Sequence, residues 1–192
     1  MARTVGSDGE RTEAAIRAAA VRLIAESGYE GVSMRRLAEA VGVQAGAIYR
    51  YFPTKQALLV SMMREHMSHL LESWRAARPA GAEPVDELAA FARFHALYHI
   101  DRRDEVFINY MELRSLDPEG FAEIAGLRRA YERELRAILE RGRDAGAFAV
   151  EDAAVAAMAI IAMLTGVATW RKPGGRLSPD EIAALYRRMA LR

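Results

Sequence analysis

The chain has 192 residues, 52% of them hydrophobic, which is enough for a full core in one domain or in a small domain plus a larger one. It contains no cysteine, so disulfides, thiolate catalysis and cysteine metal sites are excluded. Net charge is only +1, yet residues 1–78 carry 11 Lys/Arg against 8 Asp/Glu, which makes the N-terminal part the basic end.

The start of the sequence does not look like a secretion signal, since MARTVGSDGE is polar and has no apolar run. Residues 153–170 are apolar and uncharged, but they are alanine-rich, contain Gly166 and are close to the minimum length of a membrane span. Small residues on an apolar helix also suit tight packing in a protein core. We therefore expect a cytoplasmic protein.

The first predicted helix covers residues 10–27 and follows a polar segment, residues 1–9, that we expect to be disordered. Apolar residues recur along this helix at helical spacing, and Gly28 marks its end. Tyr29 and Val32 are expected to pack beneath the next two helices. The predicted buried stripe consists of Ile16, Ala19, Ala20, Leu23 and Ile24.

Two short helices joined by a tight turn are predicted from Ser33 to Lys55. Ser33 is a good N-cap for a helix over residues 34–41. Gly42 stands where the chain reverses, a position that often needs a positive φ. The second helix, residues 44–51, ends before Pro53 because a residue preceding proline disfavours the α region. Its inward residues are Ile48 and Phe52, and Ala45, Gly46 and Ala47 leave its outer face nearly bare.

A bare second helix after a glycine turn is typical of a helix-turn-helix that reads the major groove of DNA. The alternative is an ordinary helical hairpin in a core. Charge argues against that alternative, because residues 31–55 contain four cations and Glu39 as their one anion. Tyr49 and Tyr51 beside Arg50 are also hard to explain as core residues.

The segment GYEGVSMRRLAEAVGVQAGAIYRYFPTKQALL is similar to the DNA-binding signature of the tetracycline-repressor (TetR) family of bacterial transcription regulators. This resemblance extends over about residues 16–59. It implies that Gln44, Ala45 and Gly46 face base edges and that Tyr49, Tyr51 and Lys55 hold phosphates. Ser33 and Arg35 would face the DNA backbone, and Arg3 would add a weak contact.

Two positions depart from the common pattern of the family. Ala45 stands where lysine or arginine is frequent, and Ala47 where threonine or serine is frequent. At both positions alanine lacks a polar side chain that could contact the DNA. Gln44 then remains to pair with adenine, and Arg50 to pair with guanine or a phosphate.

The remainder of the chain also has helical periodicity, and no strand pattern competes with it. A helix over residues 55–78 carries Leu59, Met63, His66, Leu70 and Trp74 along one side. After a Pro/Gly-rich loop, helices are predicted over residues 84–100, 102–114, 118–145, 153–170 and 179–192. Pro84, Pro118 and Pro179 each suit the first turn of a helix, and Ser178 with Glu181 forms a capping box.

These elements predict an all-α fold of nine helices. The sequence divides into a three-helix DNA-binding domain, residues 1–54, and a ligand-binding and dimerisation bundle of six helices, residues 55–192. The helix that begins at Lys55 connects the two domains, and we expect it to transmit movement between them.

The helices over residues 84–114 are rich in aromatic residues and methionine. Aromatic stripes at helical spacing usually belong to a core, but the family resemblance implies a ligand cavity here and a hydrophobic effector. His95, Asn109 and Arg114 are candidate polar contacts, because buried polar groups must be paired. The candidate ligand-binding residues are Phe91, Phe94, His95, Tyr98, Phe107, Tyr110, Met111, Arg114 and Trp170.

The helix over residues 153–170 is apolar nearly all round and must be covered on every side. It is either the central core helix of a monomer or half of a homodimer interface, which the family resemblance implies and which would match two DNA half-sites. The candidate interface residues are Ala156, Ile160, Met163, Val167, Ile182, Tyr186 and Met189.

The segment ATWRKPGGRLSPDEIAALY is similar to the end of TetR-family regulators of lipid and steroid breakdown that respond to acyl-coenzyme A thioesters. This resemblance implies an acyl-CoA effector. Arg171, Lys172 and Arg176 beside Trp170 would meet its phosphorylated, adenine-bearing head. The alternatives are an ordinary basic turn and a lipophilic drug or metabolite as effector.

Other classes of protein fit less well. No clustered nucleophile or acid/base set indicates an enzyme, and nothing calls for a cofactor. The four histidines form two pairs at helical spacing, His66/His69 and His95/His99, but a metal site needs a third ligand. A helical protein-interaction module without DNA binding remains the alternative from another class.

Overall fold

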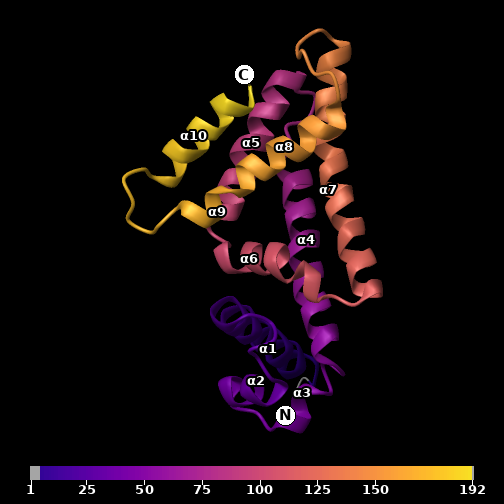
Figure 1. Cartoon of the computed structure of the whole chain (residues 1–192), viewed down its shortest axis with the longest axis vertical. Helices are drawn as coiled ribbons and strands as arrows, with labels where there is room; N and C mark the ends of the chain where they lie inside the picture. Colours follow the sequence, from indigo (N-terminus) through magenta and orange to yellow (C-terminus); the bar gives the residue numbers. More distant parts are fainter. Residues whose placement is uncertain (1–4, 192) are drawn as a thin grey trace. The chain divides into compact units, whose positions relative to one another are not determined.

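The computed structural model describes residues 5–191, which form ten α-helices, one 3₁₀ helix and no strand. The helices follow one another along the chain as Figure 1 labels them. Their bounds are α1 (Val5–Ser27), α2 (Met34–Val41), α3 (Ala45–Ile48), α4 (Lys55–Ala77), α5 (Pro84–Ile100), α6 (Arg103–Met111), η1 (Glu112–Ser115), α7 (Pro118–Asp144), α8 (Ala153–Thr165), α9 (Val167–Trp170) and α10 (Pro179–Ala190).

Several helix ends lie where the sequence predicts them, and the predicted capping groups are in place. The Ser33 hydroxyl accepts a hydrogen bond from the Arg36 amide and caps α2. Gly42 has φ 74° and is in the left-handed conformation that ends α2. Ser178 and Glu181 form both hydrogen bonds of a capping box at the start of α10.

The prediction that residues 1–9 are disordered is wrong for residues 5–9, because α1 already begins at Val5. Once a helix is nucleated, each further residue adds one backbone hydrogen bond, so a packed helix is extended at little cost into a polar segment. Arg3, a predicted weak DNA contact, lies outside the described residues.

The second helix of the predicted helix-turn-helix is shorter than expected. It ends at Ile48, and residues 49–51 continue as turns in which the amides of Arg50 and Tyr51 donate to the carbonyls of Ala47 and Ile48. These bonds span three residues, which is the tighter 3₁₀ pattern common at helix ends. The α-helix therefore gives way to 3₁₀-type turns before the chain reaches Pro53.

The apolar stretch of residues 153–170 divides at Gly166 into α8 and α9. By length and composition it would pass as one membrane-crossing helix, and a third of it is buried in the structure. The thirteen residues of α8 rise only about 20 Å, which is less than the ~30 Å of a bilayer core. This geometry favours the packing role.

The chain separates into two compact units. Unit 1 comprises the described residues up to Glu65 together with Phe107–Ile124, and unit 2 comprises His66–Val106 together with the residues from Ala125 onward. Helices α4, α6 and α7 each contribute residues to both units. The two compact units do not coincide with the predicted domains, because residues 107–124 are grouped with the N-terminal helices. The division into a DNA-binding domain, residues 1–54, and a ligand-binding domain, residues 55–192, therefore stays a prediction.

The core of unit 1 forms between α1 and the two helices that follow it. The predicted stripe of α1 is buried, as are Tyr29 and Val32. Ile48 of α3 is fully buried, and Phe52 lies in the same core. Gly120 of α7 lets the chain approach α4 closely, since a Cβ there would lie 2.6 Å from Val60 Cγ2. Unit 1 is thus a packed support for α2 and α3.

The core of unit 2 is built around Trp74 of α4 and Phe91 of α5, whose rings meet edge to face at 4.9 Å. Helix α5 packs against α8, α9 and α10. One carboxylate, Glu87, is almost fully buried in α5, where it pairs with Arg78 and Arg141. Because both arginines are partly exposed, these two ion pairs lie at the edge of the core.

Candidate nucleic-acid interface and effector site

The surface of α3 in unit 1 has the form that a DNA groove requires. Gln44, Ala45 and Gly46 are exposed, whereas Ile48 on the opposite face holds the helix on the core. A Cβ added to Gly46 would meet nothing within 4 Å. The bare face predicted from the sequence is therefore open to a partner that approaches closely.

Aromatic and basic side chains flank this face. Tyr49 is half exposed, Arg50 is exposed and Tyr51 is partly buried. Lys55, at the first position of α4, places its ammonium 3.9 Å from the centre of the Tyr29 ring. Such a cation–π contact holds the charge beside the surface where the sequence predicts a phosphate.

Arg35 and Arg36 differ in their surroundings. Arg35 is exposed and pairs with Glu39 one helical turn away, at 3.2 Å. Exposed pairs of this kind contribute little, so the Arg35 guanidinium stays available to an anion. Arg36 donates to the hydroxyl of Ser27 at 3.2 Å, which ties α2 to the end of α1.

A contact that the sequence analysis did not identify fixes the loop before α2. Glu112, a buried carboxylate in η1, accepts from the backbone amide of Tyr29 at 3.0 Å and from the Ser115 hydroxyl at 2.8 Å. Nothing in the local sequence marks this glutamate, since its partner is 83 residues away. The hydrogen bond from Glu112 of η1 thus helps to position Tyr29, whose ring lies beneath Lys55.

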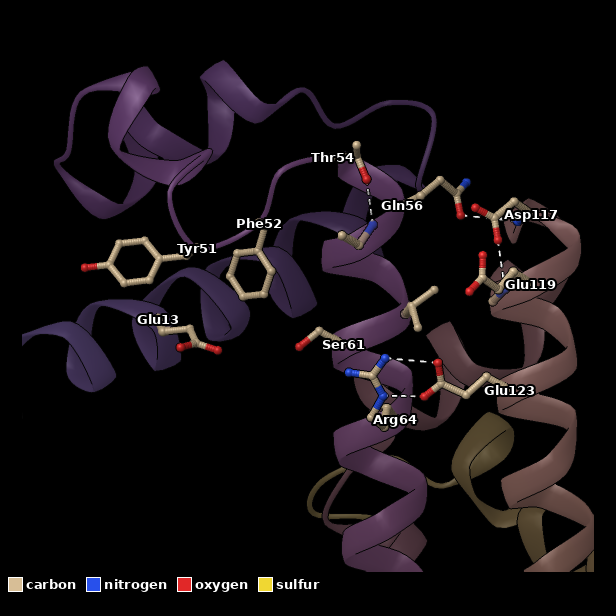
Figure 2. Close-up of a pocket in the computed structure, with 13 residues that line it drawn as sticks. Glu13, Tyr51, Phe52, Thr54, Gln56, Ser61, Arg64, Asp117, Glu119 and Glu123 are labelled. Atoms are coloured by element: carbon tan, nitrogen blue, oxygen red, sulfur yellow. Dashed lines mark hydrogen bonds and ion pairs between the residues drawn. The ribbon is translucent and has the colours of Figure 1, made fainter. Parts of the chain in front are cut away.

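A groove of about 480 Å³ in unit 1 lies between α1, the first turns of α4 and the start of α7. Figure 2 shows Arg64 and Glu123 facing one another across it, with a hydrogen bond of 3.0 Å between Nη2 and Oε2. This hydrogen bond lowers the pKa of the Glu123 carboxyl. The other charged groups in its lining, Glu13, Asp117 and Glu119, are acidic. Such a lining suits neither phosphates nor a hydrophobic effector.

In unit 2 the structure brings together four of the predicted ligand-binding residues of α5. Phe94 contacts Trp74 and Tyr98, and Phe91 contacts His95, with ring centres 5.6–5.8 Å apart. His95 is fully buried, and its ring nitrogens lie 3.0 Å from the Tyr131 hydroxyl and 2.9 Å from the Thr165 hydroxyl. The Trp74 indole nitrogen is buried without a hydrogen-bond partner among residues 5–191.

The remaining predicted ligand-binding residues of the α6 region belong to unit 1. Phe107, Tyr110 and Met111 are exposed there, and so is Arg114 of η1. Asn109, the other candidate polar contact, is buried. The predicted set is therefore divided between the two units, and whether its members contact a ligand stays a prediction.

An exposed apolar surface follows α8 and α10 in unit 2. Val155 and Met158 of α8 and Leu185 and Met189 of α10 expose between 39% and 56% of their surface. Ala156, Ile160, Met163 and Tyr186 are partly buried. Val167 and Ile182, both predicted for the interface, are instead buried in a small core with Ile100 and present no surface to a partner. Gly166 keeps right-handed helical backbone angles (φ −52°, ψ −22°), so Val167 continues the buried stripe of Ala157 and Leu164.

A basic cleft of about 240 Å³ lies between α9 and α10. Trp170 is half exposed, stacks on Tyr186 and donates its indole N–H to the Tyr186 hydroxyl at 3.0 Å. The Arg171 Nε is shielded and has no hydrogen-bond acceptor in the described part of the chain. The cleft is lined by Trp170, Arg171, Lys172, Gly175, Arg176, Leu177 and Ile182.

Comparison with known proteins agrees with both parts of this description. The tetR family of bacterial regulatory proteins matches residues 16–62, and the tetracyclin repressor-like C-terminal domain matches residues 81–192. The fatty acid metabolism regulator protein of Bacillus subtilis (strain 168) is 29% identical over 128 residues, which span 67% of this chain and 66%, just under two thirds, of that protein.

Two further relatives match over nearly the whole chain. The HTH-type transcriptional repressor KstR2 of Rhodococcus jostii (strain RHA1) is 26% identical over 185 residues, 95% of this chain and 90% of that protein. The crystal structure of AibR in complex with isovaleryl coenzyme A and operator DNA matches with a TM-score of 0.86 and 29% identity, covering 93% of this chain and 97% of that one. The domain matches span more than half of the sequence, and the chain belongs to the TetR family of DNA-binding transcriptional repressors, which carry out no enzymatic chemistry.

Proposed function

We propose that this protein is a cytoplasmic, dimeric repressor that binds a palindromic operator and is released from it by a hydrophobic effector, an acyl-coenzyme A thioester. The observation that carries the DNA-binding part is the open face of α3 over residues 44–46, with Tyr49, Arg50 and Lys55 beside it. Gln44 and Arg50 are the groups that reach base edges, and Tyr49, Tyr51, Lys55, Ser33 and Arg35 contact the DNA backbone.

The basic cleft beside Trp170 supports a thioester of coenzyme A over a plain lipophilic compound. Three cations surround it, and the Arg171 Nε lacks an acceptor within the described residues. Arginine next to an aromatic ring suits a phosphorylated head that also carries a purine. The acyl chain would lie among the aromatic residues of α5. The relative AibR, whose crystal structure contains isovaleryl coenzyme A and operator DNA, lends this assignment weight.

The effector assignment is tested by release of DNA. We expect the protein to bind a fragment of its own upstream region, and long-chain or steroid-derived acyl-CoAs to weaken that binding, whereas the matching free acids do not. Arg176→Ala should raise the acyl-CoA concentration needed for release about tenfold, because it removes one charged contact. Arg143→Ala, an exposed arginine at the end of α7, is the matched control. Release by acids and thioesters alike would point instead to a lipophilic drug or metabolite as effector.

The exposed apolar surface of α8 and α10 is assigned to a second copy of the chain. A two-fold dimer presents two α3 helices, as a palindromic operator requires. We expect Met158→Arg to give a monomer in sedimentation experiments and to weaken operator binding, because it places a charge at the centre of an apolar contact. Ala147→Arg, in the exposed loop after α7, adds the same charge outside that surface. A dimer that survives Met158→Arg would contradict this assignment.

A further inference from the structure

A second link between distant segments of unit 1 accompanies the hydrogen bond from Tyr29 to Glu112. The side-chain amide of Gln56, in the first turn of α4, donates to the backbone carbonyl of Ser115 at 2.6 Å and accepts from the backbone amide of Asp117 at 3.3 Å. Figure 2 shows the second of these bonds. Gln56 therefore binds the connection between η1 and α7 from two sides.

Both links converge on the buried residue Tyr29. The Glu112 carboxylate accepts from the Tyr29 backbone amide at 3.0 Å, and the Gln56 side chain forms a hydrogen bond with the Tyr29 hydroxyl. Glu112 also lies against the end of α1, since a Cβ on Gly28 would be 3.7 Å from its Oε1. Tyr29 is thus held at its backbone and at its hydroxyl by side chains that lie outside the helix-turn-helix of residues 33–55.

The Tyr29 ring in turn determines where one charge of the DNA-facing surface lies. The Lys55 ammonium is 3.9 Å from the centre of this ring. A lysine ammonium stands on a long flexible stem, and without a contact it samples many positions. A ring fixed beneath it favours one of them through the cation–π attraction. An ammonium that is already in place loses less conformational entropy when it meets a phosphate.

We propose that Glu112 and Gln56 are positioning residues for operator binding. They fix the Tyr29 ring, and the ring holds the Lys55 ammonium at the place where it meets a DNA phosphate. This inference rests on the proposed function, because it requires that Lys55 contacts DNA. It extends the DNA-binding machinery to residues 112–117, which are far from the helix-turn-helix in the sequence and need not touch DNA themselves.

Two simpler roles of Glu112 lead to different expectations. If Glu112 served the fold alone, its removal would lower the stability of the protein and leave the contact between Lys55 and phosphate unchanged. If Glu112 acted by its charge alone, it would repel DNA, and its neutralisation would raise operator affinity within the range of about one Debye length, ~8 Å at physiological salt. Positioning predicts neither result.

Two substitutions of Glu112 separate these roles. In Glu112→Gln the amide oxygen still accepts from the Tyr29 amide and the NH₂ group donates to the Ser115 hydroxyl, so we expect wild-type operator affinity. Glu112→Ala removes the acceptor, and we expect operator affinity to fall about tenfold through the loss of one charged contact. The matched control Glu123→Ala removes a carboxylate of the same segment that pairs with Arg64, and it should leave operator affinity unchanged.

The route through Lys55 has a signature in the salt dependence of operator binding. Each lost phosphate contact reduces the slope of log affinity against log salt concentration by about 0.9. We expect Glu112→Ala and Lys55→Ala to reduce this slope alike, by up to that amount per subunit. Glu112→Ala should cost no further affinity in a Lys55→Ala background. Gln56→Ala should behave like Glu112→Ala, and because alanine favours helix this variant keeps the test available if Glu112→Ala does not fold.

A measurement without DNA tests the positioning itself. The ring current of Tyr29 shifts the NMR signals of the Lys55 side-chain protons that lie over the ring. In Glu112→Ala and Gln56→Ala these signals should move toward those of an unstructured lysine, whereas in Glu112→Gln they should stay in place.

Three results would overturn this inference and leave operator binding intact: Lys55 signals that do not move, a loss of affinity from Glu112→Ala that is equal with and without Lys55, or a gain of affinity from Glu112→Gln. If Lys55→Ala changes neither affinity nor slope, the phosphate contact in the proposed function is wrong, and the inference is overturned with it. If the protein binds no operator, the proposed function fails, and the Lys55 signals alone decide whether Glu112 and Gln56 position the ammonium.

Discussion

Gly46→Glu is expected to abolish operator binding while the protein remains folded. The position faces open space, with no atom within 4 Å of an added Cβ and no strained φ. Glutamate is a better helix former than glycine, so thermal stability should be unchanged or slightly raised. On DNA, however, the same side chain would push a carboxylate between α3 and the groove. Like charges in an interface cost several kcal/mol, which corresponds to a loss of at least about a hundredfold in affinity.

The matched control is Gly126→Glu, which makes the same change in sequence and charge in α7 of unit 2. Its nearest neighbour would be Arg129 Nη2 at 3.9 Å, so this glutamate is also tolerated. Fluorescence anisotropy with a labelled operator gives both affinities, and circular dichroism confirms folding. Retention of operator affinity by Gly46→Glu would show that α3 does not enter the groove.

Acid is expected to unfold unit 2 at an unusually high pH, between about pH 4 and pH 5. His66, His95 and His99 all have lowered pKa values, chiefly because burial disfavours their charged forms. The folded state therefore binds fewer protons than the unfolded chain below pH 6.5, so stability falls as the pH drops toward the folded-state pKa values. Each histidine costs about 1.4 kcal/mol per pH unit in this window. Three such groups remove about 8 kcal/mol by pH 4.5, comparable with a total stability of ~5–15 kcal/mol.

The transition is followed by fluorescence of Trp74, which is fully buried in this core. His66→Leu removes one of the three groups and should shift the midpoint to lower pH. A midpoint that lies below pH 3 in the wild type, or that does not move in the variant, would contradict neutral burial of the three histidines.

Local signals in the sequence predict most of the helix boundaries correctly. Ser33, Gly42 and the Ser178–Glu181 capping box act through hydrogen bonds within four residues, so a local pattern contains all the information. The shortened α3 and the early start of α1 are harder to predict. Both depend on the balance between weak local preferences and the packing of distant elements.

The parts of the candidate sites that were missed depend on contacts between residues far apart in sequence. Glu112 supports Tyr29 across 83 residues, and no local pattern distinguishes it from a solvent-exposed glutamate. An apolar helix does not reveal which of its faces the chain itself covers, and only the packing against Ile100 and Ile182 shows that Val167 points inward.

The central claim, that effector and operator bind to one protein and oppose one another, is tested most directly by measuring each affinity in the presence of the other. Acyl-CoA should weaken operator binding by some factor, and saturating operator DNA should weaken acyl-CoA binding by the same factor, because coupling between two sites is reciprocal. Equal factors well above one would support a ligand-released repressor. Acyl-CoA that binds with the same affinity to the free and the DNA-bound protein would contradict the account.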